Sequence, residues 1–179
     1  IVKELTFITP AFLAGANQNI PEIRVPSIRG ALRWWFRVLA GGRDVRKEED
    51  ELFGTVHGTV RASAISVRVE DANIVNNQQA LSLPNETPMG YIGYFARVSG
   101  KKEGIQRTEA LHYIGAGSTF TLTIRAVRPV PTHLWSLLEE AVQAFVWVGA
   151  LGLRATRGFG RLAEPSALPT AQAFRDWAR

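Results

Sequence analysis

Two basic segments, far apart in the chain, carry residue types that can bind phosphate. Residues 26–37 read PSIRGALRWWFR and residues 149–161 read GALGLRATRGFGR, and neither contains an acidic residue. Arginine contacts two phosphate oxygens at once, and glycine lets the backbone approach an anion closely. The two segments together therefore predict contact with the phosphate backbone of a nucleic acid.

The first segment predicts a helix over residues 27–40, with Ser27 as its N-cap and the Gly41–Gly42 pair as its stop. At 100° per residue the apolar positions form one stripe and the arginines form an adjacent ladder. The stripe consists of Ile28, Leu32, Trp35 and Leu39, and the ladder of Arg29, Arg33 and Arg37. We expect the ladder to contact phosphate; pairing with the acidic residues 48–51 is the alternative. Trp34, off the stripe, can stack on a base or pack in a core or subunit interface.

The second segment interleaves glycines with arginines. The glycines are Gly149, Gly152, Gly158 and Gly160, and the arginines are Arg154, Arg157 and Arg161. Glycine permits positive φ, so the backbone can turn amide N–H groups toward an anion while the arginines supply charge. Gly149 is predicted to end the preceding helix. The remainder predicts a cradle for a polyanion.

The elements that must position these segments alternate between strand and helix. Strands are predicted at 2–9, 61–70, 119–127 and 160–163, helices at 27–40 and 132–148, and a short charged helix at 47–53. The order βαββαβ indicates an α+β, ferredoxin-like (RRM-like) fold, an antiparallel sheet with two helices on one face. A stretch at about 71–111, rich in proline, glycine and asparagine, is predicted to be a long insertion between the second and third strands of a single domain, 1–179.

Two of these elements have clear buried faces. In the strand at 119–127, alternation places Phe120, Leu122 and Ile124 inward. Thr132 can cap the second long helix, whose apolar positions fall at nearly helical spacing. That stripe consists of Leu134, Leu138, Ala141, Phe145 and Val148.

Composition narrows the class of protein. With 179 residues, 46% of them hydrophobic, the chain can bury a core of its own. The absence of cysteine excludes disulfides, thiolate nucleophiles and sulfur-bound zinc, and it suits a reducing compartment. No run reaches the roughly 18 apolar residues of a membrane span, so we expect a cytoplasmic protein that does not contact a membrane. A net charge of +5 favours an anionic polymer or an acidic protein as partner.

Catalytic and cofactor signals are weak. The three histidines, His57, His112 and His133, all lie outside the basic segments, so none is predicted to act as a general acid or base. No histidine or carboxylate cluster has metal-ligand spacing, and no phosphate-binding loop of the nucleotide hydrolases occurs. We therefore expect neither a metal nor a cofactor.

Residues 26–33 (PSIRGALR) and 152–160 (GLRATRGFG) resemble the paired motifs of the RAMP superfamily of CRISPR RNA-binding proteins. A longer block, which adds FLAGAN at 12–17 and ELFG at 51–54, looks like the family of first subunits of the Cmr (type III-B) effector complex. The resemblance covers about the first 54 residues and positions 145–162. Members of that family usually carry two such lobes, whereas this chain has room for one.

The resemblance implies a ferredoxin-like fold and a non-catalytic role in antiviral defence, holding guide RNA and target RNA beside other Cmr or RAMP subunits. It implies RNA contact by Arg24, Arg29, Arg33, Arg37, Gly152, Arg154, Arg157, Gly158, Gly160 and Arg161. One alternative is a metal-independent endoribonuclease that processes precursor guide RNA, as some RAMP relatives do. Another is a protein-interaction subunit that does not touch RNA and uses Trp34, Trp35 and the acidic run as its interface.

Overall fold

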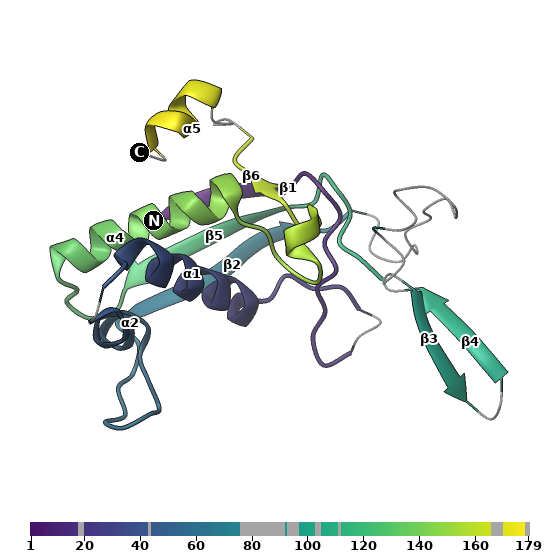
Figure 1. The fold of residues 1–179 in the computed structure, drawn as a ribbon, viewed down its shortest axis with the longest axis horizontal. Coiled ribbons are helices and arrows are strands. Elements are labelled where there is room, and N and C mark those ends of the chain that lie inside the picture. Colours follow the sequence, from purple (N-terminus) through teal and green to yellow (C-terminus); the bar gives the residue numbers. More distant parts are fainter. Residues whose placement is uncertain are drawn as a thin grey trace.

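A four-stranded antiparallel sheet forms the centre of the protein. The computed structural model describes residues 1–17, 20–42, 44–75, 92, 97–102, 105–110, 112–165 and 170–177. The sheet has the order β2-β5-β1-β6, and every neighbouring pair of strands is antiparallel (Figure 1). Its strands are β1 (Val2–Phe7), β2 (Ile65–Asn73), β5 (Thr119–Ala126) and β6 (Leu162–Ala163). The predicted mixed α+β class is confirmed.

Two long helices pack together on one face of this sheet, α1 (Val25–Ala40) and α4 (Thr132–Val148) (Figure 1). Shorter helical elements in the described residues include α2 (Val45–Phe53) after α1, and the 3-10 turn η2 (Ala155–Arg157) and α5 (Ala171–Trp177) after α4. No helix in the described ranges is both long and apolar enough to cross a bilayer.

Proline shifts the starts of both long helices from the predicted positions. The N-cap of α1 is Arg24 rather than Ser27, because Pro26 lies in the first turn, where its fixed φ fits and its missing N–H costs nothing. The N-cap of α4 is Pro131, and Thr132 is already helical. The predicted stop of α1 is confirmed, since Gly41 adopts the left-handed conformation with φ of 49°.

The core lies between the sheet and the two long helices. Phe120, Leu122 and Ile124 are buried as predicted, and Ile28 and Leu32 of α1 are buried with them. The predicted apolar stripes of α1 and α4 both differ from the buried positions that the structure shows. Phe36 supplies a core position of α1, while Trp35 and Leu39 are only partly buried. Val148 at the end of α4 is 37% exposed and lines a surface groove, although Phe145 and Val146 in the same turn are buried.

Strand β2 runs three residues beyond its predicted end, through a register irregularity between Glu70 and Asn73. Much of the predicted insertion at about 71–111 lies outside the described residues. Within it, β3 (Arg97–Lys102) and β4 (Ile105–Ala110) pair as a separate two-stranded sheet (Figure 1).

Candidate nucleic-acid interface

The two basic segments lie side by side, although they are more than a hundred residues apart in the chain. They share the walls of a surface groove of about 330 Å³. Its lining residues are Ala31, Trp34 and Trp35 from α1 and Val148, Gly149, Ala150, Ala155 and Thr156 from the end of α4 and the glycine-rich segment. The segments therefore meet through the tryptophans of α1, whereas the arginine ladder faces α2.

Glu49 of α2 pairs with two members of the ladder. Arg37 Nη1 lies 2.9 Å from Glu49 Oε1, and Arg33 Nε donates to the same oxygen. The Glu49 side chain is only 5% exposed, whereas those of Arg33 and Arg37 are 34% and 47% exposed. Pairing with the acidic run, the alternative in the sequence interpretation, is what the structure shows here. Two positive charges and one negative charge leave this cluster a net charge of +1 for a ligand.

Arg29 is engaged with the end of α2. Its Nη2 donates to the carbonyl of Phe53, and its guanidinium carbon lies 5.6 Å from the centroid of the Phe53 ring. Burial, and secondarily the charge of Arg33, lower the pKa of Arg29 from its usual value. A cation at the C-terminus of a helix is favourable because the last carbonyls carry partial negative charge. Arg29 therefore fixes α1 against α2.

Arg24 at the N-cap of α1 forms a surface ion pair. Its Nε lies 2.9 Å from Glu22 Oε1, and the two side chains are 39% and 50% exposed. Exposed ion pairs contribute little to stability because water competes for both charges. The pair therefore restrains Arg24 only weakly.

Arg161 stabilises the end of α4. Its Nη1 donates to the carbonyl of Gly149 at 2.8 Å, and its Nη2 donates to that of Trp147. Burial lowers the pKa of Arg161 from its usual value. These carbonyls have no partner within the helix, so the guanidinium satisfies groups that would otherwise need water.

Three glycines of the second segment have positive φ, but for different reasons. At Gly160 (φ 69°) a Cβ would lie 1.8 Å from the carbonyl oxygen of Leu151, and at Gly152 (φ 96°) it would lie 2.5 Å from that of Phe12. Close backbone packing therefore requires these two glycines. Gly158 (φ 85°) is different, because an added Cβ would meet nothing within 4 Å. This glycine serves the turn alone.

The tip of the glycine-rich segment is what faces solvent. Hydrogen bonds from Leu153 N to Phe12 O, at 2.9 Å, and from Gly160 N to Pro10 O, at 2.8 Å, anchor its two sides. Between them Arg154 adopts φ of 60° and leads into η2, at whose end Arg157 is exposed. Within the part of the chain that the structure describes, Arg157 has no carboxylate partner. Its charge is therefore available to a ligand.

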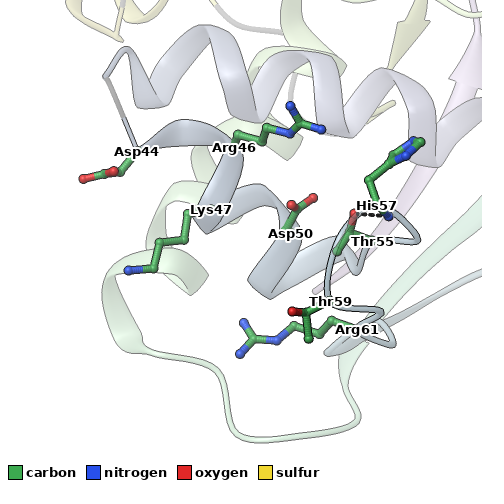
Figure 2. A pocket seen from close by; sticks show the side chains of 8 residues that line it. All are labelled: Asp44, Arg46, Lys47, Asp50, Thr55, His57, Thr59 and Arg61. Carbon is green, nitrogen blue, oxygen red and sulfur yellow. Dashed lines mark hydrogen bonds between the residues drawn. The ribbon is translucent and has the colours of Figure 1, made fainter.

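Another hollow, which is polar and which the sequence interpretation missed, lies between α2 and the loop that follows it. Its volume is about 600 Å³ (Figure 2). It is lined by Asp44, Arg46, Lys47, Asp50, Thr55, His57, Thr59 and Arg61. The bridge between Thr55 and Arg61 folds the loop back beside the helix, so that His57 lines the same hollow as the cations Arg46 and Lys47. The signal in the sequence was the basic pair Arg46 and Lys47, which lie four and three residues before Asp50 on the same helix.

Metal ligands do not gather in this hollow or elsewhere in the described ranges, where no group of three histidine or acidic side chains has a suitable arrangement.

Comparison with known proteins gives a consistent family assignment. The model of the RAMP superfamily matches residues 4–163. CRISPR system Cmr subunit Cmr1-2 of Pyrococcus furiosus is 30% identical over 177 residues, which cover 90% of this chain and 92% of that protein.

Solved structures show the same fold. The crystal structure of Cmr1 from Pyrococcus furiosus, in its apo form, has a TM-score of 0.62 and 26% identity, covering 98% of this chain and 51% of that chain. A chain of the type III-B Cmr-beta complex bound to cognate target RNA has a TM-score of 0.55 and 14% identity, covering 90% and 52%. The chain thus spans about half the length of these two solved chains.

Proposed function

The chain belongs to the RAMP superfamily and to its Cmr1 subunits, and from this membership we propose that it is a non-catalytic RNA-binding subunit of a type III-B CRISPR effector complex. Its proposed partners are guide RNA, target RNA and other Cmr or RAMP subunits. The proposed location is the cytoplasm, in keeping with the absence of cysteine. The complex-level role draws support from the Cmr names of its relatives.

The observation that carries the RNA-binding proposal is the exposed Arg157 at the tip of a segment anchored by glycines and free of acidic residues. We propose that Arg157, Arg154 and Gly158 contact the sugar-phosphate backbone directly. Arg24 and the net positive charge of the Arg33, Arg37 and Glu49 cluster add to the electrostatic attraction for RNA. Arg29, Arg161, Gly152 and Gly160 act by holding the surface in shape. Contacts of this kind do not depend on the sequence of the RNA, so base pairing with the guide RNA selects the target.

We also propose a ferredoxin-like topology within a single domain, 1–179, whose insertion covers about 71–111. The order β2-β5-β1-β6, with β1, β2, β5 and β6 as the four strands of a βαββαβ plan, supports this topology. Helices α1 and α4 on one face of the sheet agree with it (Figure 1).

Arg157→Ala is expected to lower the affinity for single-stranded RNA several-fold and to leave stability unchanged. Loss of one neutralised phosphate should make the slope of log K against log salt shallower by about 0.7. Fluorescence anisotropy of labelled RNA, titrated at several salt concentrations, measures both quantities.

The matched control is Arg68→Ala, which removes an exposed arginine from β2. Its neighbours Val67 and Val69 pack toward the core, so Arg68 faces away from the helices. Equal losses of affinity in the two variants would assign RNA binding to net charge rather than to the tip. A salt-independent affinity of the unaltered protein would contradict backbone binding altogether.

A second candidate function is cleavage of precursor guide RNA, which the hollow around His57 favours (Figure 2). The hollow contains the groups that cleavage through a 2′-hydroxyl needs, since His57 supplies a general acid or base and Lys47 and Arg61 supply positive charge for the phosphate. The imidazole, however, points away from both cations (Figure 2). We expect no cleavage, because this hollow also contains Asp44 and Asp50, which repel a phosphodiester.

The test is incubation of repeat RNA with the protein in a chelating buffer, followed by gel analysis. We expect the RNA to remain intact with both the unaltered protein and His57→Ala. Product that forms with the unaltered protein and disappears with His57→Ala would establish the nuclease instead.

A further inference from the structure

Trp34 presents an aromatic surface to solvent at the mouth of the groove between α1 and the glycine-rich segment. It is 50% exposed, although tryptophan is usually covered in a folded protein. Its ring lies 4.7 Å from that of Trp35, centroid to centroid, at an interplanar angle of 86°. This edge-to-face contact holds the indole in place while half of the side chain stays uncovered. The result is a fixed aromatic wall beside an empty groove.

Two small residues lie one turn before the tryptophans, and one of them, Ala31, lines the groove. Side chains on a helix lean toward its N-terminus, so Trp34 and Trp35 lie over the turn that contains Gly30 and Ala31. A Cβ added at Gly30 would meet nothing within 4 Å, and the φ of Gly30 is not positive. Neither packing nor backbone geometry therefore requires glycine here, yet glycine inside a helix lowers stability relative to alanine. A bare position of this kind permits close approach by a ligand backbone.

The charge around the groove favours nucleic acid over a protein partner. Helix α1 (Val25–Ala40) and residues 149–161 contain no acidic residue, and Arg157 follows directly on Thr156 of the groove wall. An apolar slot with Arg157 next to its wall combines the two features that bind single-stranded RNA, an aromatic platform and positive charge for the phosphates.

We propose, resting on the RNA-binding function above, that this groove binds an unpaired RNA base. The base stacks on the indole of Trp34, its sugar-phosphate passes over Gly30, and Arg157 binds a neighbouring phosphate. Stacking accepts every base, so the groove contributes affinity without choosing a sequence.

The experiment compares a short uridine oligomer with an abasic ribose-phosphate oligomer of the same length, each labelled and titrated with the full chain. Trp34→Ala is expected to lower the affinity for the uridine oligomer about tenfold and to leave that for the abasic oligomer unchanged. Trp34→Phe should keep most of the affinity, because a smaller ring still stacks. Val38→Ala is the matched control: Val38 is 51% exposed on the same helix but does not line the groove.

Gly30→Ala gives an independent test, because its two effects have opposite signs. Without RNA the variant should melt about 1–4 °C higher, since alanine favours the helix. Its affinity for the uridine oligomer should nevertheless fall several-fold, because the new methyl group keeps the RNA backbone at a distance. A variant that is more stable and binds as well as the unaltered protein would contradict the close approach.

The outcomes separate this inference from the function on which it rests. If the protein binds both oligomers and Trp34→Ala changes neither affinity, the base site is wrong and phosphate binding stands. If Trp34→Ala instead loses other Cmr subunits in co-purification while its RNA affinity is unchanged, the groove is a protein interface. If the unaltered protein binds neither oligomer, the RNA-binding function itself is overturned.

Discussion

Gly160→Ala is expected to lower the free energy of unfolding by about 3 kcal/mol or more. The added Cβ would lie 1.8 Å from the carbonyl oxygen of Leu151, a backbone atom that cannot turn aside. Relief requires the Ala150–Arg161 bridge to open and the hydrogen bond from Leu151 N to Gly160 O, 2.9 Å long, to break. Urea unfolding followed by circular dichroism measures the loss, which corresponds to about 6–12 °C in melting temperature for a chain of this size.

Gly158→Ala is the matched control, because Gly158 also has positive φ but has open space around it. Only the cost of the left-handed conformation applies there, about 1–2 kcal/mol. If the two variants lost the same stability, backbone strain alone would explain both, and the close packing at Gly160 would play no part. The comparison therefore separates glycines required by packing from glycines required by the turn.

The double variant Arg33→Ala/Arg37→Ala is expected to be strongly destabilised, because it leaves the carboxylate of Glu49 buried without a cation. Removing one side of a buried pair costs about 3–5 kcal/mol when both partners are buried. Both arginines are partly exposed and water can replace some of their effect, so we expect about 2–3 kcal/mol here. Each single variant should lose less, since the other arginine still contacts Glu49.

Adding Glu49→Gln to the double variant provides the control. It removes the uncompensated charge while keeping the shape of the side chain, so much of the lost stability should return in urea unfolding. A triple variant as unstable as the double variant would show that the stability comes from side-chain packing, such as that of Arg33 against Phe53, and not from charge. Arg33 lies 5.9 Å from the centroid of that ring, which makes the comparison necessary.

These two results bear on the RNA surface, because they divide its arginines by role. Loss of RNA affinity in a variant of Arg33 or Arg37 has to be corrected for the unfolded fraction before it is assigned to a lost phosphate contact. Arg157 needs no such correction, since its exposed side chain has no carboxylate partner in the described ranges. The tip is therefore the clearest place to measure RNA binding.

The sequence by itself determined the main strands and helices and most of their buried positions. The period-two pattern at 119–127 and the period of 3.6 at 28–39 and 134–148 are local, because burial on one face fixes which residues in a strand or helix can be apolar. The pattern did not identify Phe36 as a core residue, and it included Val148, which is exposed. The end of α1 at Gly41 is also a local feature, because the left-handed conformation concerns a single residue and glycine adopts it without steric cost. The two motifs also sufficed to indicate the family.

Only the tertiary structure decided which arginines are available to a ligand. Arginine on a helical wheel looks the same whether it meets water, RNA or a carboxylate, and Glu49 lies twelve residues beyond Arg37 on another helix. Gly152 and Gly160 likewise look like ligand-binding glycines until Phe12 and Leu151 are placed against them. Electrostatic pairing and steric contact depend on distances through space, which a one-dimensional pattern does not contain, so the division between structural and exposed charge had to come from the fold.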